Sequence, residues 1–260
     1  MSILVDYVMS LFTPSAPGAR RLGYVGESFA IRARQRRQST AWAPHQAETQ
    51  RFLSDLPVVG ARLVVLGSGP LLDVPLEALA QRWPEVVLVD VVHARPARTR
   101  ASALPNVRCV TLDLTGCLSA LDEGRGVPTP RPPALPQAEG ATVVSLNLLS
   151  QLPILPLERL ASLRVDAEAG EAFARALVAG HVRWLRGLGA VRAALVSDTQ
   201  RRWFTRGSEA VEVEDALHGV RLAGVPDRAW TWEVAPWGEI DAQTRLTLDV
   251  QAWFDVPAPE

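Results

Sequence analysis

Two short segments of the chain contain the residue types that bind a nucleotide-like ligand. The apolar run 64–66 ends in Gly-Ser-Gly at 67–69, and a second apolar run at 87–89 ends in Asp90. Glycines at a strand end let the backbone turn sharply and approach a ligand, and a carboxylate after the next parallel strand can accept hydrogen bonds from a ribose diol. With a helical stretch between them, the two segments predict half of a mononucleotide-binding βαβ unit. The pattern therefore favours a ligand that contains a nucleoside.

Composition excludes several other classes of protein. The chain has 260 residues, 48% of them hydrophobic, and a net charge of −1, which fits one large α/β domain with a small extension. All 27 basic residues are arginine and the net charge is near zero, so nucleic acid is not an expected partner. The two cysteines, Cys109 and Cys117, are too few for a disulfide framework or a zinc site, so no metal is expected.

The N-terminal run 3–12 contains Asp6 and is too short to span a bilayer. It also lacks the basic start and the cleavage site of a signal peptide. We therefore expect no membrane contact and a cytoplasmic location.

Hydrophobic periodicity predicts a helical segment 1–56, then alternating strands and helices from residue 57 onward. One helix is expected at 27–38, and a second is expected to begin at Pro44 and to bury one face, formed by Thr49, Phe52, Leu53 and Leu56. Uninterrupted Val/Leu runs are typical of strands covered on both faces. Strands are expected at 62–66, 86–89, 107–112, 143–147 and 193–196, helices at 75–83 and 167–186, and a terminal β-hairpin at 229–234 and 244–254. The proline-rich segment 122–140 predicts an exposed loop.

This order of segments resembles the class I S-adenosylmethionine-dependent methyltransferase superfamily over residues 57–255. The family has a seven-stranded, mostly parallel sheet whose last two strands pair antiparallel. The resemblance therefore implies a Rossmann-like α/β domain of this kind at 57–260, preceded by a small N-terminal helical extension at 1–56 that could form a lid.

The resemblance also implies S-adenosylmethionine as the cofactor, and it implies a role for particular residues. Gly67, Ser68 and Gly69 would line the methionine part, Asp90 would bind the ribose hydroxyls, Asp113 would meet the adenine amino group, and Asn147, with Leu148 and Leu149, would form the floor beneath the sulfonium.

The chain departs from the family pattern at three places. Val65 stands where the family usually has an acidic residue, and Leu71 stands where it usually has a third glycine. The loop 147–153 lacks the Pro-Pro-aromatic step of the members that methylate DNA or glutamine nitrogen, so methylation of a nucleobase amine is not expected.

Several of these residues have alternative interpretations. Asp90 could cap its strand or pair with Arg95 or Arg98, and Asp113 could form a turn by bonding its own backbone. Asp73, two residues before Pro75, is interpreted as a helix cap in preference to a partner of the cofactor's ammonium.

Other polar and aromatic residues are interpreted as structural. His181 is expected in the core, whereas His45 and His218 are expected on the surface. Arg32, Arg34, Arg36 and Arg37 are expected on a solvated helix with internal ion pairs rather than on an anion-binding lid. Trp230 and Trp232 are expected in core or dimer packing rather than in an aromatic wall for a substrate.

The sequence thus predicts methyl transfer from S-adenosylmethionine to an unidentified small or medium-sized acceptor. No catalytic residue is singled out, although Asp198, Glu233, His181 or an N-terminal residue could act as a base. The alternatives are a non-catalytic protein of the methyltransferase fold, used for binding or as a scaffold, and a nicotinamide-dependent oxidoreductase. The sequence does not predict the oligomeric state.

Overall fold

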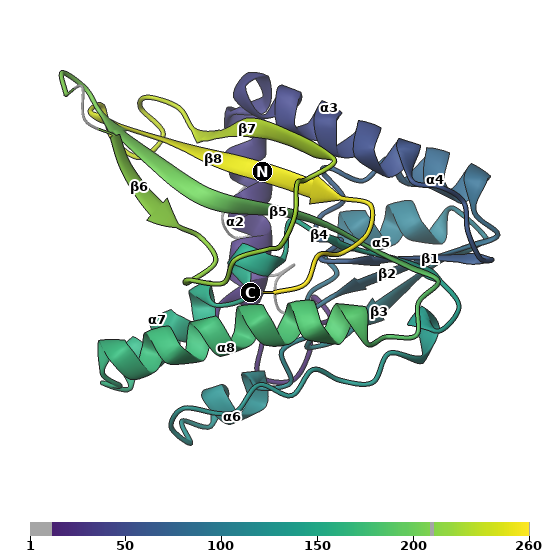
Figure 1. Ribbon diagram of the computed structural model, residues 1–260, viewed down its shortest axis with the longest axis horizontal. Helices are drawn as coiled ribbons and strands as arrows, with labels where there is room; N and C mark the ends of the chain where they lie inside the picture. The colour runs from purple at the N-terminus through teal and green to yellow at the C-terminus, as the bar shows by residue number, and fades with distance from the viewer. Residues whose placement is uncertain (1–11, 209–210, 260) are drawn as a thin grey trace.

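The Val/Leu-rich runs form the centre of a twisted sheet (Figure 1). In residues 12–208 and 211–259, which the computed structural model describes, eight strands make one sheet in the order β3-β2-β1-β4-β5-β8-β7, with β6 paired to β5. The strands are β1 (Arg62–Leu66), β2 (Glu85–Asp90), β3 (Val107–Thr111), β4 (Thr142–Leu146), β5 (Arg192–Thr205), β6 (Val211–Asp215), β7 (Arg228–Ala235) and β8 (Thr244–Trp253).

The first five strands are parallel, whereas β8 runs antiparallel to both β5 and β7. This is the Rossmann-like α/β sheet with a terminal antiparallel hairpin that the sequence predicts, so the fold class is confirmed. The number of strands differs, because β6 adds an eighth strand beside β5.

Strand β5 is also much longer than the predicted 193–196. The register shifts between Asp198 and Gln200, and the strand then continues to Thr205, paired with β8 on one side and β6 on the other. A β-bulge re-aims a strand without ending it. Beyond the bulge, β5, β6 and β8 extend away from the helices (Figure 1).

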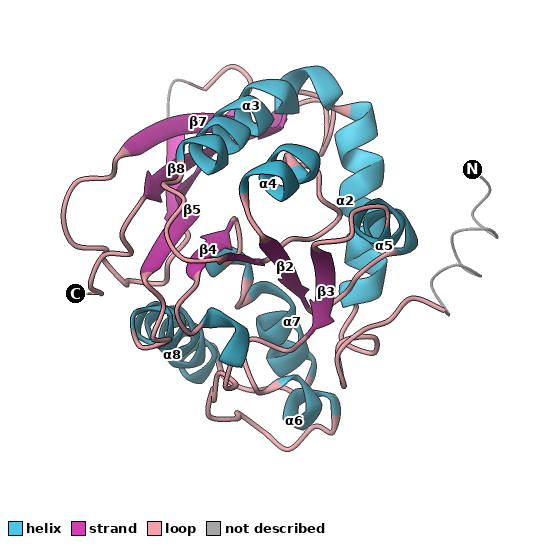
Figure 2. Cartoon of the chain, turned by 90° about the vertical axis from the view of Figure 1, so that its right-hand side faces the viewer, coloured by secondary structure: helices cyan, strands magenta, loops and turns pink. Residues whose placement is uncertain are grey.

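Helices cover both faces of the sheet (Figure 2). They are α2 (Tyr24–Arg37), α3 (Ser39–Asp55), α4 (Leu76–Arg82), α5 (Arg95–Ser102), α6 (Leu118–Asp122), α7 (Ile154–Ser162) and α8 (Ala167–Arg186), with short 3₁₀ turns at Pro136–Ala138 and Leu149–Gln151. Helices α3, α4 and α5 pack in the apolar cluster on one face, and α8 packs in the cluster on the other.

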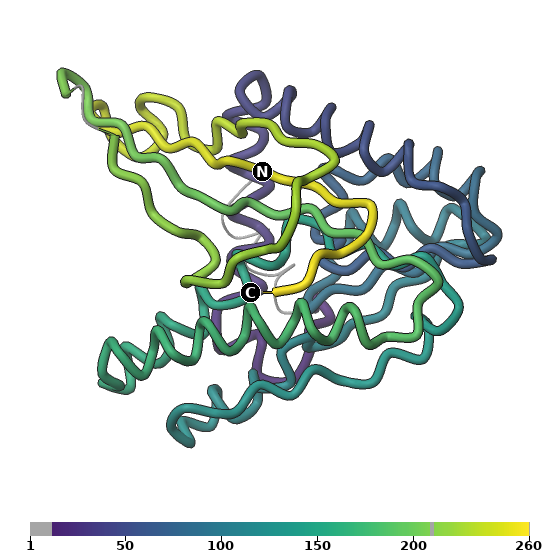
Figure 3. The backbone as a smooth tube through the Cα atoms, viewed as in Figure 1, coloured from purple at the N-terminus to yellow at the C-terminus, as the bar shows by residue number. Residues whose placement is uncertain are grey.

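The second N-terminal helix begins earlier than predicted. Helix α3 starts at Ser39, and Pro44 lies inside it. The predicted apolar face is confirmed, because Thr49, Phe52, Leu53 and Leu56 are all fully buried. Although far apart in the sequence, α3 and β7 lie side by side (Figure 3).

The proline-rich segment is only partly the exposed loop that its composition predicts. Residues 123–127 are exposed, but Leu135 and Ala138 are buried in the core beneath α8. The Trp184 indole N–H also donates to the Pro133 carbonyl at 3.0 Å. The second half of the segment is therefore packed, because its apolar side chains cover the sheet where a crossover helix would otherwise lie.

The predicted N-terminal run 3–12 lies outside the described residues except for Phe12. Within 12–208 and 211–259, no helix combines the length and the apolar character needed to cross a membrane.

Candidate active site

A cavity of about 460 Å³ lies at the carboxyl edge of the parallel strands. Its wall on the sheet side consists of the loops that follow β1, β2, β3 and β4, and the opposite wall comes from α2 and α7. In open α/β sheets, ligands bind in the crevice outside the carboxyl ends of the strands. All six residues predicted to bind the cofactor, namely Gly67, Ser68, Gly69, Asp90, Asp113 and Asn147, line this cavity.

The loop after β1 depends on left-handed backbone conformations. Gly67 has φ 75°, and a Cβ there would lie 2.8 Å from the Leu146 carbonyl oxygen, so only glycine fits against β4. Gly69 has φ 50°, but a Cβ at this position would meet no atom closer than 3.9 Å. Position 67 therefore packs the loop on the sheet, whereas position 69 leaves space beside it.

Leu71 adopts the same left-handed conformation, with φ 60°. This is the position at which the methyltransferase pattern usually has a third glycine. The side chain is 3% exposed and packs in the core, which offsets the backbone strain of about 1–2 kcal/mol. The loop thus keeps a glycine-like shape without the glycine. Val65 is fully buried in the same cluster and supplies no polar group to the cavity.

Asp90 holds the glycine loop. One carboxylate oxygen accepts the Gly69 N–H at 2.7 Å, and the other accepts the Val92 N–H at 3.1 Å. Burial raises the pKa of Asp90, and the nearby His93 and the backbone N–H groups partly oppose this rise. The alternative of an ion pair with Arg95 or Arg98 does not occur in the described structure. A carboxylate offers about four acceptor positions, so these contacts do not use all of them.

Asp113 forms a turn with the residues that follow it, as its alternative interpretation predicts. One carboxylate oxygen accepts from the Thr115 backbone N–H at 2.8 Å and from the Thr115 hydroxyl at 2.6 Å, and the other accepts the Leu118 N–H at 3.0 Å. Tyr24 of α2 lies near this carboxylate. The pKa of Tyr24 is raised, first by burial and then by the negative charge of Asp113. Asp113 therefore shapes the wall where α2 meets the strand ends.

Asn147 and Asp73 meet on the floor of the cavity. Asn147 has φ 48°, a conformation that is rare for residues other than glycine and that clusters at functional sites. Its amide donates to the Asp73 carboxylate at 3.1 Å. The predicted capping role of Asp73 is wrong, because α4 begins at Leu76 and no side chain caps it. Asp73 points to Asn147 instead.

A buried histidine of α3 lies beside this pair. His45 is fully buried, so its predicted surface location is wrong. The Trp230 indole donates to its Nδ1 at 3.0 Å, which leaves the proton of the neutral ring on Nε2, and this atom lies 3.6 Å from the Asp73 carboxylate. Its ring stacks on Trp232, with centroids 4.0 Å apart. Helix α3 and strand β7 thus place a buried imidazole beside Asp73.

The tryptophans also reach the cavity itself. Trp42 and Trp232 both line it and pack edge to face, with ring centroids 4.9 Å apart. The prediction of core packing for Trp232 is confirmed, since it is 6% exposed, but its ring also forms part of the cavity wall. Its indole N–H is buried without a hydrogen-bond partner in the described structure.

Three candidate bases from the sequence lie elsewhere. His181 is a core residue, as predicted: it contacts the Ser145 hydroxyl at 3.0 Å, and burial lowers its pKa to about 3. Asp198 is buried against Ser150, and Glu233 pairs with Arg245 at 3.5 Å. None of the three candidates lines the cavity. Leu149 does not line it either, because this side chain is fully buried in the core.

The arginines of α2 are partly accounted for by one glutamate. Glu239, in the turn between β7 and β8, pairs with Arg37 at 2.6 Å and Arg34 at 3.4 Å, and accepts from Gln38 at 2.6 Å. These contacts lower the pKa of Glu239, with Arg37 the largest cause. The prediction of internal ion pairs is therefore confirmed for Arg34 and Arg37.

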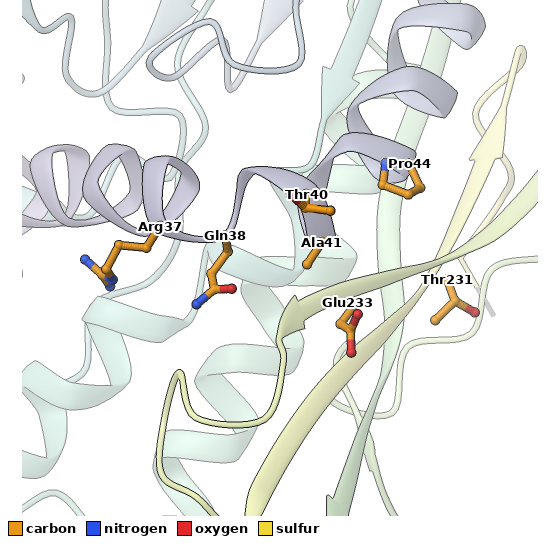
Figure 4. Close-up of a pocket in the computed structure, with 7 residues that line it drawn as sticks. All are labelled: Arg37, Gln38, Thr40, Ala41, Pro44, Thr231 and Glu233. Atoms are coloured by element: carbon orange, nitrogen blue, oxygen red, sulfur yellow. The ribbon is translucent and has the colours of Figure 1, made fainter.

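A second hollow of about 380 Å³ lies beside this junction, between the start of α3 and β7 (Figure 4). Arg37, Gln38 and Thr40 line one side, and Thr231 and Glu233 of β7 line the other. Arg37 is engaged by Glu239 and Glu233 by Arg245, so the charges of this hollow are already paired.

Comparison with known proteins gives only distant likenesses. No protein-family model matches the sequence, and no curated protein matches it. Among solved structures, the 1,6-didemethyltoxoflavin-N1-methyltransferase of Burkholderia thailandensis is 11% identical with a TM-score of 0.41, over 97% of this chain and 92% of that one. The N-methyltransferase NodS of Bradyrhizobium japonicum is 11% identical with a TM-score of 0.37, over 80% and 86%. An rRNA methylase of Escherichia coli is 13% identical with a TM-score of 0.36, over 96% and 77%.

Proposed function

We propose that this chain is an S-adenosylmethionine-dependent methyltransferase that acts on a small or medium-sized acceptor. The observation that carries the proposal is the cavity of about 460 Å³ in which the glycine loop, Asp90 and the Asn147–Asp73 pair converge at the carboxyl edge of the sheet. The antiparallel pairing of β7 with β8 at the end of a mostly parallel sheet is the arrangement that the sequence resemblance implies.

The residues present fit this cofactor. Ser68, which lines the cavity, is 4% exposed, and its hydroxyl has no partner in the described structure. A buried hydroxyl without a partner is costly unless a ligand bonds to it. Asp90 retains lone pairs for the ribose hydroxyls, and Asp73 places a carboxylate where it can bind the ammonium. When bound, the cofactor supplies an electrophilic methyl group on a sulfonium.

The protein's own contribution is position and exclusion of water. Methyl transfer is an in-line substitution, so alignment of the acceptor with the methyl group is the main requirement. Asn147 donates to Asp73, which lies beside His45, whereas α2 lines the cavity on the opposite side. We therefore propose that α2 and α3, within the extension 1–56, complete the active site as a cover over the domain 57–260.

The sheet does not favour a nicotinamide-dependent oxidoreductase. The classic dinucleotide-binding order is 3-2-1-4-5-6 with two mononucleotide halves. Here an antiparallel strand follows β5 in the sheet, so the second half is not repeated. A protein without catalytic activity would still bind the same cofactor, so binding and turnover must be measured separately.

The proposal is tested by thermal unfolding with S-adenosylhomocysteine or NADH. At 100 times its dissociation constant, S-adenosylhomocysteine should add about 2.7 kcal/mol of stability, and NADH should add none. The Asp73→Asn variant should bind S-adenosylhomocysteine more weakly. The matched control is Asp255→Asn, because that carboxylate is 76% exposed and pairs with Arg192, away from the cavity. Stabilisation by NADH alone would refute the proposal. Release of S-adenosylhomocysteine during incubation with S-adenosylmethionine and a metabolite extract would distinguish an enzyme from a binding protein.

A further inference from the structure

The cavity contains more negative charge than the proposed cofactor accounts for. Five carboxylates line it, and the only basic side chain of the described lining is Arg34, which Glu239 engages. Three of the carboxylates, Asp73, Asp90 and Asp113, stand at strand ends on the cofactor side. The other two, Glu27 of α2 and Glu158 of α7, belong to the opposite wall.

These two glutamates have no ion-pair or hydrogen-bond partner among the side chains that the structure describes. Both are exposed, and neither forms an ion pair or a side-chain hydrogen bond among the described residues. Most of the remaining wall on their side is apolar, with Ile31 of α2 and Leu155 of α7 lining the cavity beside them. An uncompensated pair of carboxylates at the rim of an apolar cavity raises the local concentration of cations and disfavours anions.

Aromatic rings form part of the same cavity wall. Trp42 and Trp232 are almost fully buried and line it, and the indole N–H of Trp232 lacks a partner in the described structure. The Trp232 ring stacks on His45 and packs edge to face with Trp42, so the two rings add apolar surface, and a buried indole N–H normally finds an acceptor. This lining is therefore suited to a ligand with an apolar body, beside the two carboxylates of the rim.

We propose that the methyl acceptor is a small, largely apolar amine that carries a positive charge when it binds, with Glu27 and Glu158 as its charge-recognition residues. The proposal rests on the proposed function, because it concerns the part of the cavity that the cofactor leaves open. It names the class of acceptor and makes no statement about which of its atoms receives the methyl group.

The test uses three ligands with the same body and different charge: phenethylamine, 2-phenylethanol and 3-phenylpropionate. Each is titrated by calorimetry into the full-length protein, with and without saturating S-adenosylhomocysteine. Phenethylamine should bind at least about tenfold more tightly than the alcohol, and 3-phenylpropionate should bind most weakly. Equal affinities, or an amine that does not bind, would overturn the proposal.

Substitutions of the two glutamates test whether these residues recognise the charge of the amine. Glu27→Gln and Glu158→Gln should each weaken phenethylamine binding about threefold, and the double variant about tenfold, because each removes one partly screened charge. All three should leave binding of the uncharged alcohol and of S-adenosylhomocysteine unchanged. The control Glu168→Gln, on the exposed first turn of α8, should have no effect. Amine binding that ignores both substitutions would refute the role of these glutamates. Failure of S-adenosylhomocysteine to bind at all would refute the proposed function instead.

Discussion

Asp90→Asn should disturb the apoprotein far more than its small change of shape suggests. The two carboxylate oxygens each accept one backbone N–H, from Gly69 at 2.7 Å and from Val92 at 3.1 Å. An amide has one oxygen acceptor, and its nitrogen only donates. In Asp90→Asn, one of the two N–H groups therefore faces an NH₂ group and loses its partner.

The expected magnitude follows from this count. Leaving one buried donor unsatisfied costs about 1–3 kcal/mol, so Asp90→Asn should lower the free energy of unfolding by that amount. Asp90→Ala leaves both donors without the side chain, but water can enter from the cavity, so its cost should be similar rather than double. A solvated carboxylate with no structural role would give no change in either variant.

Equilibrium unfolding in urea measures this term without ligand, and calorimetry with S-adenosylhomocysteine measures the second role of Asp90. If the carboxylate also binds the ribose, both variants should bind at least about tenfold more weakly, since charge-assisted hydrogen bonds contribute about 1.5–3 kcal/mol. A urea midpoint for Asp90→Asn equal to that of the wild type would show that the carboxylate does not hold the loop.

Three further outcomes are expected from other sites. Gly67→Ala should destabilise the fold most, because its Cβ would lie 2.8 Å from the Leu146 carbonyl oxygen in addition to the left-handed strain. Gly69→Ala should cost only the strain of its φ of 50°, about 1–2 kcal/mol, because its Cβ meets no close atom, and it should bind S-adenosylhomocysteine more weakly; calorimetry and urea unfolding of both variants check this. The pKa of His181 is lowered to about 3, so below the unfolded value of about 6.5 only the unfolded chain gains a proton, and stability should fall by about 2 kcal/mol from pH 7 to pH 5. His181→Leu should remove most of that slope, and an unchanged slope would contradict a buried neutral imidazole. Limited trypsin digestion should cut at exposed Arg125 before Arg159, which lies in α7 and donates to the Leu121 carbonyl at 3.1 Å, and mass spectrometry of the first fragments would reveal the reverse order.

Local sequence patterns predicted the parallel part of the sheet well. Residues 62–66 and 86–89 correspond to β1 and β2 because buried parallel strands need continuous apolar runs. The pattern missed β6, all of whose residues are exposed, and it ended β5 too early. An exposed edge strand such as β6 is stabilised mainly by backbone hydrogen bonds to its neighbour, so its sequence shows no hydrophobic pattern. It could be predicted only once the extension of β5, its pairing partner, was known.

The candidate site was likewise predicted where its residues are close in the sequence, and missed where they come from distant segments. The glycine loop and Asp90 lie within one βαβ unit, where spacing along the chain determines spacing in the fold. The histidine beside Asp73 comes instead from α3, and its partner Trp230 comes from β7, which is separated from α3 by most of the chain. His45 occupies a helix face whose apolar character comes from Phe52 and Leu53, and nothing near it in the sequence marks it as a buried polar residue.

For the same reason, the helices that cover the cavity could be predicted from the sequence, but their orientation could not. The sequence predicts a helical extension at 1–56, but which face it turns to the strand ends depends on the break at Gln38, where φ is −108° and ψ is 25°. Glu239 fixes this break by contacting Arg34, Arg37 and Gln38 together. Its position in the β7–β8 turn means that the terminal hairpin orients the helix carrying Glu27. Helix α2, near the start of the chain, and the β7–β8 hairpin, near its end, therefore together position Glu27 at the mouth of the cavity, and they meet only in the folded protein.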